Sequence, residues 1–292
     1  MVREILPDIF EIRTPLGEVF VNVYIVRNGH QAILIDSGLK KTASEIFRVL
    51  DDLGLEKSGL KYVINTHSHH DHIGSNDEIR KKCACKILSH EKGVSWIENH
   101  RLQFHEFLGQ FPTLLPPSQE MEQLFFENLG EPCPVDETIS GESRLELENF
   151  PEIWLVPLPG HSEDSIGVYL KDRNILIAGD AILRRGVGKS FPQYEDRMAY
   201  LESIQKIREL NPGILLTAHF DLLTGIDLEE FLNQSEAAVW EIDYRIATVK
   251  QQLGENAPLW DVAKAVHEGA NKDLTVQGLL TVQAHLREDE KE

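Results

Sequence analysis

The sequence predicts an α/β protein in which two β-sheets pack face to face and helices cover their outer faces. Strand-like segments occur in two groups along the chain, one before residue 66 and one after residue 143, and helical segments accompany each group. After about residue 226 the pattern is helical only. With 292 residues, 41% of them hydrophobic and 26% charged, the chain has enough apolar side chains for a substantial core.

The first group contains predicted strands and a helix. Val19–Val26 is rich in β-branched and aromatic residues, and Gln31–Ile35 is a short apolar run. A helix is expected from about Thr42, with Thr42 as N-cap and Glu45 completing a capping box. The next strand, Lys61–Asn65, leads directly into a group of histidines.

Residues 91–130 interrupt the strands with helical stretches at Val94–Phe111 and Gln119–Leu129. An insertion of this kind between strand-rich halves is typical of a cap or lid. Its aromatic residues are Trp96, Phe104, Phe107, Phe111, Phe125 and Phe126. These rings either pack the insertion onto the body or line a substrate pocket, and the sequence leaves both interpretations open.

The second group is expected to form the other sheet. Its predicted strands are Arg144–Phe150, Ile153–Leu158, Ser165–Leu170, Asn174–Ala178 and Ile214–Ala218. A helix is predicted at Arg197–Leu210, and later helices at Leu228–Leu253, Trp260–Glu268 and Thr275–Leu286. We therefore divide the chain into a main domain, residues 1–225, and a C-terminal helical subdomain, residues 226–292.

The net charge and the number of cysteines limit the partners and the cellular compartment that we expect for this protein. The formal net charge of −19 repels polyanions, which makes nucleic acid an unlikely partner without excluding it. Cys83, Cys85 and Cys133 are too few and too oddly spaced for a disulfide framework, so free thiols in a reducing compartment are expected. Neither a signal peptide nor an apolar run of membrane-spanning length is visible. We expect a cytoplasmic protein that binds no membrane.

The segment Asn65–His72 concentrates metal-capable side chains: His67, His69, His70, Asp71 and His72. Burying so many such groups without partners would be costly, so packing does not explain them. In an extended or turning backbone His67 and His69 point to the same side, whereas His70 has the opposite parity and is not expected to be a ligand. Asp71 and His72 lie just beyond, within reach of a second metal centre.

This segment resembles the metallo-β-lactamase superfamily, whose signature is His-x-His-x-Asp-His. The matching residues are His67, His69, Asp71 and His72, followed in the family's order by His161, Asp180 and His219 at predicted strand ends. The resemblance covers roughly residues 5–225 and implies a four-layer αββα sandwich.

The resemblance also implies a binuclear metal centre. One metal would be held by His67, His69 and His161, and the other by Asp71, His72 and His219, with Asp180 bridging. Imidazole and carboxylate ligands without thiolate suit two divalent ions, zinc first, with iron and manganese also compatible. Asp36, in Leu34-Ile-Asp-Ser-Gly38, matches another family motif and either orients a ligand histidine or caps a turn.

The implied activity is that of a metal-dependent hydrolase in which a metal-bridging hydroxide attacks a carbonyl or phosphoryl centre. Asp180 would hold the bridge, and Asp71 would orient the nucleophile or carry its proton, so these are the expected catalytic residues. True β-lactamases lack a histidine at the place of His72 and often use a cysteine ligand, which disfavours antibiotic hydrolysis.

Two kinds of substrate compete. The leading one is a small ester-like molecule, either a thioester, as in glyoxalase II, or a lactone. The alternative is a phosphodiesterase or endoribonuclease of the lactamase-beta-like type, whose tail the C-terminal helices resemble. That activity would need cationic side chains along a groove, and the candidates are Arg184, Arg185 and Lys189. These could instead clamp one acidic group of a small substrate or form an exposed loop.

A third class, a non-catalytic binding protein with a vestigial metal site, is disfavoured by the intact ligand set. A homodimer is compatible with the sequence.

Overall fold

The computed structural model describes residues 1–55, 57–148, 150–186 and 189–289 and contains two β-sheets. The seven-stranded sheet has the order β1-β2-β3-β4-β5-β6-β7, and the six-stranded sheet the order β13-β12-β11-β10-β9-β8. The strands of the first are β1 (Val2–Leu6), β2 (Ile9–Leu16), β3 (Val19–Asn28), β4 (Gln31–Ile35), β5 (Leu60–Ile64), β6 (Lys86–His90) and β7 (Glu137–Ile139). Those of the second are β8 (Ser143–Leu145), β9 (Ile153–Pro157), β10 (Ile166–Leu170), β11 (Ile175–Ile177), β12 (Ile214–Leu216) and β13 (Leu223–Thr224).

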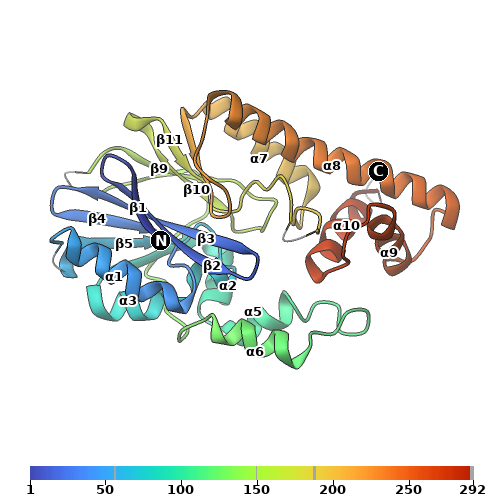
Figure 1. Cartoon of the computed structure of the whole chain (residues 1–292), viewed down its shortest axis with the longest axis horizontal. Coiled ribbons are helices and arrows are strands. Elements are labelled where there is room, and N and C mark those ends of the chain that lie inside the picture. The colour runs from blue at the N-terminus through green and yellow to red at the C-terminus, as the bar shows by residue number, and fades with distance from the viewer. Residues whose placement is uncertain (56, 149, 187–188, 290–292) are drawn as a thin grey trace.

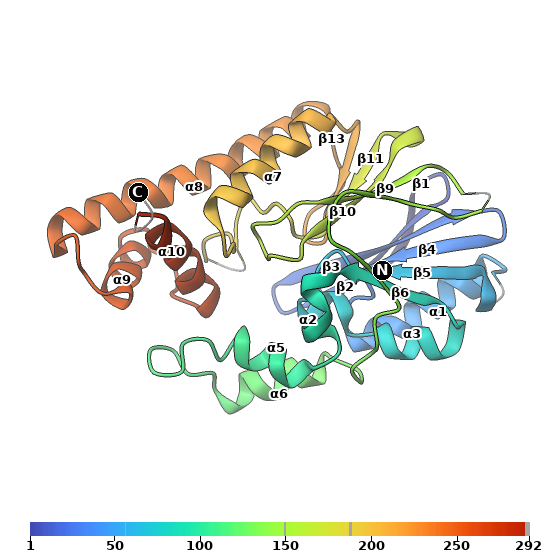
Figure 2. The same ribbon diagram turned by 180° about the vertical axis from the view of Figure 1, so that it is seen from behind.

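Helices cover the outer faces of both sheets, so the body has four layers (Figures 1 and 2). On the first sheet α1 (Ala43–Asp52) and α3 (Asn76–Cys83) bury apolar side chains such as Ile46 and Ile79 against β-strand residues. On the second sheet α7 (Arg197–Leu210) and the long α8 (Gly225–Leu253) do the same. The predicted fold class is confirmed.

Strand β4 shows why its sequence is a continuous apolar run. Ile33 and Ile35 point into the core between the two sheets, whereas Ala32 and Leu34 point to the core beneath the outer helices. Alternate residues of a strand face opposite sides, so a strand covered on both faces needs apolar residues throughout. Burying each such large aliphatic side chain stabilises the fold by about 1.5–3 kcal/mol.

The strand directions bring several loops to one end of the sandwich. Strands β4 and β5 are parallel, β9 and β11 are both antiparallel to β10, and β12 is parallel to β11. The segments that follow these strands therefore emerge at a common edge in each sheet. They carry the residues predicted to form the site: Asp36, His67, His69, Asp71, His72, His161, Asp180 and His219.

Two helical parts flank this edge (Figure 1). The insertion contains α4 (Val94–Ile97), α5 (His100–Glu106) and α6 (Gln119–Glu127), and the C-terminal part adds α9 (Leu259–Gly269) and α10 (Val276–Asp289). Phe104, Phe125 and Phe126 pack against one another with ring centroids 5.2–5.5 Å apart, whereas Phe107 faces a pocket. The packing interpretation is therefore confirmed for the first three rings, and a role in a substrate pocket stays a prediction for Phe107.

Two local predictions are wrong, and that of Thr42 as N-cap holds for its position only. Thr42 precedes α1 but makes no capping bond, because its hydroxyl lies 3.0 Å from that of Thr14 in β2. The predicted helix Val94–Phe111 is broken at Asn99, whose side chain caps α5 by accepting a hydrogen bond from the backbone of Leu102. The predicted strand Arg144–Phe150 shrinks to β8, with residue 149 outside the described residues.

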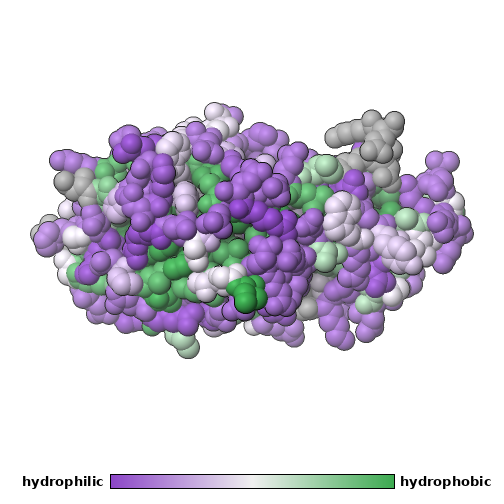
Figure 3. All heavy atoms as spheres, turned by 90° about the horizontal axis from the view of Figure 1, so that it is seen from above, coloured by the Kyte–Doolittle hydropathy of each residue, from purple (hydrophilic) through white to green (hydrophobic). Residues whose placement is uncertain are grey.

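The surface of the protein is mainly polar. Hydrophilic residues cover most of the face seen in Figure 3, in keeping with the net charge of −19. Within the described ranges, none of the helices combines the length and the apolar character needed to cross a membrane.

Candidate metal centre and active site

All seven predicted ligands meet at the edge where the loops converge. They form three overlapping groups in which one ligand atom per residue lies within 4.8 Å of the others: His67–His69–His161, His67–His72–Asp180 and Asp71–His72–His219. We call the first the three-histidine group, and Asp71, His72 and His219 with Asp180 the mixed group. Each group could hold a metal ion.

The histidine-rich segment reaches both groups because the backbone changes conformation within it. His69 is extended, but residues His70–Ile73 form the helical turn α2. The parity argument therefore fails beyond His69, since the chain is no longer extended. His70 lies outside the three groups and packs its ring 4.9 Å from that of Phe125.

In the three-histidine group the ring nitrogens converge at hydrogen-bonding distances. Nδ1 of His69 lies 3.0 Å from Nε2 of His67 and 3.1 Å from Nε2 of His161. The ring of Phe107 stacks on His69 at 4.5 Å and closes one side. Three nitrogens directed at one another suit a shared cation better than a set of mutual hydrogen bonds.

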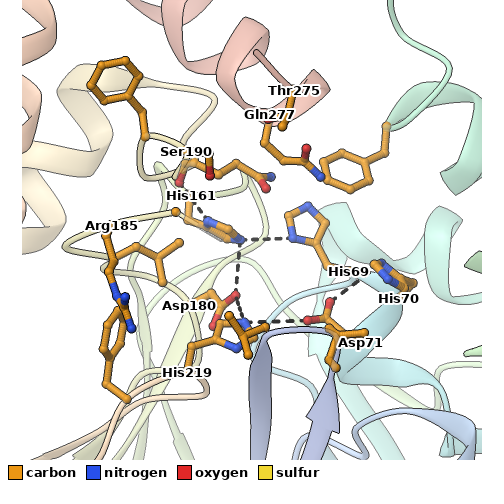
Figure 4. A pocket seen from close by; sticks show the side chains of 18 residues that line it. His69, His70, Asp71, His161, Asp180, Arg185, Ser190, His219, Thr275 and Gln277 are labelled. Carbon is orange, nitrogen blue, oxygen red and sulfur yellow. Dashed lines mark hydrogen bonds and ion pairs between the residues drawn. The ribbon is translucent and has the colours of Figure 1, made fainter. Parts of the chain in front are cut away.

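In the mixed group a single carboxylate oxygen stands between the two sets of ligands (Figure 4). Oδ2 of Asp180 lies 2.9 Å from Nε2 of His219 and 3.5 Å from Nε2 of His72. It is also 3.9 Å from Nε2 of His161, which belongs to the other group. Oδ2 of Asp71 lies 3.7 Å from Nε2 of both His72 and His219. Asp180 therefore lies between the two groups, where the predicted bridging residue is expected.

The two groups differ in charge. Burial lowers the pKa of His67 and His69 well below the ordinary value, so these rings are neutral and can act as ligands. Burial also opposes protonation of His219, but the carboxylate of Asp180 prevails and raises its pKa to about 9. In return the charges of His219 and His72 overcome the effect of burial on Asp180 and hold its pKa well below the usual range.

Each of four ligand histidines is held from behind at its other ring nitrogen. His72 bonds through Nδ1 to Oδ2 of Asp36 at 2.9 Å. The remaining rings bond to the Thr66 hydroxyl (His67, 3.2 Å), the Gln193 carbonyl (His161, 3.0 Å) and the Phe20 carbonyl (His219, 2.6 Å). Such partners fix which nitrogen is free to bind a metal.

Asp36 is held in an uncommon conformation, with φ of 58°. Its carboxylate accepts hydrogen bonds from the backbone and hydroxyl of Thr66, at 2.7 and 2.8 Å, besides its bond to His72. A left-handed backbone at a residue other than glycine has to be stabilised by its surroundings. Of the two roles expected for Asp36, these contacts correspond to the orienting one.

Close packing around the ligands also requires glycine. Gly179, directly before Asp180, has φ of 54°, and an added Cβ would lie 2.2 Å from the hydroxyl of Thr66. Gly160, directly before His161, would bring a Cβ to 2.4 Å from the backbone of Tyr200. A larger residue at either position would therefore collide with Thr66 or Tyr200 directly beside a predicted ligand.

Unpaired buried atoms test whether the site fits a metal. Nε2 of His72 and Oδ1 of Asp180 are buried and have no hydrogen-bond partner among the described residues. Buried polar atoms without partners are costly, and both belong to the mixed group. A divalent cation would satisfy them, so the donor set fits divalent metals.

The centre opens into a cavity of about 360 Å³. Apolar walls come from four parts of the chain: Leu16, Val19, Phe107, Leu183, Phe191 and Phe220. Of the predicted substrate residues Arg185 lines the cavity, but Arg184 and Lys189 are not among its lining residues. Arg184 instead lies over the ring of Phe220 at 5.1 Å and donates a hydrogen bond to Gln234.

Sequence reasoning missed the far wall of the cavity. Thr275 and Gln277, at the start of α10, line it opposite the metal ligands (Figure 4). No local motif marks them, and they follow His219 by more than fifty residues.

Comparison with known proteins agrees with this geometry. The sequence profile described as "Metallo-beta-lactamase superfamily" matches residues 16–219. The chain belongs to the metallo-beta-lactamase superfamily. Within this superfamily it is 26% identical to "Probable metallo-hydrolase YqgX" of Bacillus subtilis, over 76% of this chain and 96% of that protein. It is 24% identical to "Beta-lactamase-like protein 2 homolog" of Drosophila melanogaster, over 93% of this chain and 82% of the relative.

Two further similarities bear on activity and fold. "Hydroxyacylglutathione hydrolase GloC" of Haemophilus influenzae is 26% identical over 69% of this chain and 85% of its own length. The crystal structure of the metallo-beta-lactamase family protein TTHA1429 from Thermus thermophilus superposes with a TM-score of 0.76 at 19% identity, covering 98% of this chain and 95% of that one. This superfamily member is therefore a metal-dependent hydrolase, as the sequence predicted.

Proposed function

We propose that this hydrolase acts on a small ester-like molecule, a thioester or a lactone, with two divalent cations, zinc first, in the three-histidine and mixed groups. The observation that carries the proposal is the cavity above the ligands. Its volume of about 360 Å³ and its mainly apolar walls suit one small organic molecule.

The cations, when bound, would supply a nucleophile at neutral pH by lowering the pKa of a water molecule. The chain supplies the rest. Burial tends to raise the pKa of Asp71, but the neighbouring histidines lower it, so this carboxylate, which lines the cavity, is ionised and can accept a proton. Phe107 shields His69 from water. The guanidinium of Arg185 in the wall suits a carboxylate on the substrate.

The same features argue against a phosphodiesterase acting on RNA. Among the described residues, Arg185 is the only lysine or arginine that lines the cavity. Binding a nucleic-acid backbone calls for a row of cations, and the net charge of −19 opposes it. The relative named hydroxyacylglutathione hydrolase supports an acyl substrate for this chain.

The test compares zinc-loaded protein on a thioester, a lactone, bis-p-nitrophenyl phosphate and single-stranded RNA. We expect turnover of the thioester or the lactone. It should be lost in His67→Ala, which removes a member of the three-histidine group, and kept in His105→Ala, which removes an exposed histidine. Turnover of RNA or the phosphodiester alone would contradict the proposal.

A further inference from the structure

A chain of buried polar side chains joins the loop before α7, which carries Gln193 and Tyr194, to the C-terminal helices. The hydroxyl of Tyr194 lies 2.6 Å from Nε2 of His285 in α10, and Nδ1 of His285 lies 2.6 Å from Oδ1 of Asp243 in α8. Arg197 donates to the same carboxylate oxygen at 2.6 Å. Tyr194 is 0% exposed and His285 is 2% exposed, so these groups are removed from water.

The direction of these hydrogen bonds follows from the donor and acceptor types. The Asp243 carboxylate only accepts, so Nδ1 of His285 carries the hydrogen. In a neutral ring Nε2 then accepts from the hydroxyl of Tyr194. Burying polar side chains next to an apolar cluster costs free energy. When all of them are hydrogen-bonded, as here, they hold the joined segments in one fixed arrangement.

A second contact fixes the same loop at the neighbouring residue. The hydroxyl of Thr281, one turn before His285 on α10, lies 3.0 Å from the carbonyl oxygen of Pro192 and accepts a hydrogen bond from the backbone of Tyr194 at 3.4 Å. Gln193 lies between these two points. Helix α10 therefore holds the backbone on both sides of Gln193.

The carbonyl of Gln193 is the group that holds a metal ligand. It lies 3.0 Å from Nδ1 of His161 and leaves Nε2 of that ring directed at His69. The other carbonyl behind a ligand, that of Phe20 behind His219, belongs to strand β3 of the sandwich. His161 thus differs from His219 in depending on a loop that is held from outside the sandwich.

We propose that Tyr194, His285 and Asp243 are positioning residues for the metal centre. Together with Thr281 they hold the Gln193 carbonyl behind His161 and so set the three-histidine group. The C-terminal helices then contribute to metal binding as well as to the pocket wall, although the superfamily profile ends at residue 219. The inference rests on the proposed metal-dependent function.

The experiment measures zinc affinity by competition with a chromogenic chelator, together with the unfolding temperature of the metal-free protein. Tyr194→Phe removes the hydroxyl and keeps the ring. The matched control is Tyr169→Phe, which removes a hydroxyl bonded to Asn174 far from the ligands. We expect Tyr194→Phe to weaken the binding of one zinc by about tenfold, the lower end of the effect of losing an outer partner of a ligand. Tyr169→Phe should bind both zinc ions as the wild type does.

The outcomes distinguish residues that position the metal ligands from residues that only stabilise the fold. A lower unfolding temperature with unchanged zinc affinity in Tyr194→Phe would overturn the proposal, as would an equal loss of affinity in Tyr169→Phe. If Tyr194→Phe does not fold, Thr281→Val provides the same test, because it removes the second contact with little change of shape. Failure of the wild type to bind two zinc ions would instead contradict the two-zinc centre of the proposed function.

Discussion

Replacing Asp36 with asparagine should weaken one metal site without disturbing the fold. Asparagine tolerates the left-handed backbone that Asp36 adopts, with φ of 58°. The two carboxylate oxygens serve different donors: Oδ1 accepts from the backbone of Thr66 at 2.7 Å, and Oδ2 accepts from His72 at 2.9 Å. An amide has only one acceptor oxygen, so it can serve one of these donors.

The ring of His72 is the partner that can adapt. The backbone N–H of Thr66 cannot lose its hydrogen, whereas the ring can move its hydrogen from Nδ1 to Nε2. Nε2 is the atom that lies 3.5 Å from Asp180 and would bind the metal. Loss of such an outer partner weakens metal binding by about 10- to 100-fold, or roughly 1.4–2.8 kcal/mol.

Zinc titration against a chromogenic chelator measures this effect. We expect Asp36→Asn to bind one zinc about 10- to 100-fold more weakly and the other nearly as the wild type does. Asp51→Asn, the same change at an exposed position of α1, is the control and should change neither. If folded Asp36→Asn binds both zinc ions like the wild type, the assigned role of Asp36 is wrong.

Three further predictions follow from the site. His67→Ala should lose zinc and activity, whereas His70→Ala should retain most of both because His70 lies outside the ligand groups. Metal analysis of the two variants measures this difference. Equal losses of zinc would contradict the assignment of His67 as a ligand and His70 as a non-ligand. The pKa of His219 is raised from 6.5 to about 9, so its contribution to the stability of the metal-free protein is present below pH 6.5 and lost as the pH rises through 9. Urea unfolding of the metal-free protein should show this loss of stability between pH 6.5 and 9. Zinc displaces the same proton, so its affinity should rise over the same pH range. If neither stability nor zinc affinity changes with pH there, the raised pKa of His219 is contradicted. Arg185→Ala should raise KM for substrates with a carboxylate by about tenfold and leave neutral analogues unchanged, which steady-state kinetics would reveal.

The sequence predicted well which side chains meet, because much of their signal is local. His67, His69, Asp71 and His72 lie in one short segment, and His161, Asp180 and His219 each follow a strand whose apolar pattern is clear. The resemblance to the superfamily implied the last three, and their places at predicted strand ends agree with side chains that meet at one sheet edge.

The parts that were missed depend on tertiary contacts. The hydroxyl of Thr42 does not cap α1 because it bonds to that of Thr14, which lies in a strand far away in the sequence. Arg184 and Arg185 are neighbours and both lie over the ring of Phe220, yet only Arg185 lines the cavity, because Arg184 is also held by Phe231 and Gln234 of α8. Thr275 reaches the cavity only because α8 and α9 carry the chain back toward the ligands. Nothing in a short stretch of sequence records such a path.

The wall formed by α10 has a practical consequence for anyone who wishes to shorten the protein. A fragment cut at residue 225 would keep every ligand and most of the sandwich. It would nevertheless lose Thr275 and Gln277 from the cavity, and the hydroxyl of Tyr194 would lose its contact with His285. The smallest working unit therefore extends well past the last ligand, and a shorter version would be a poor reagent for screening substrates.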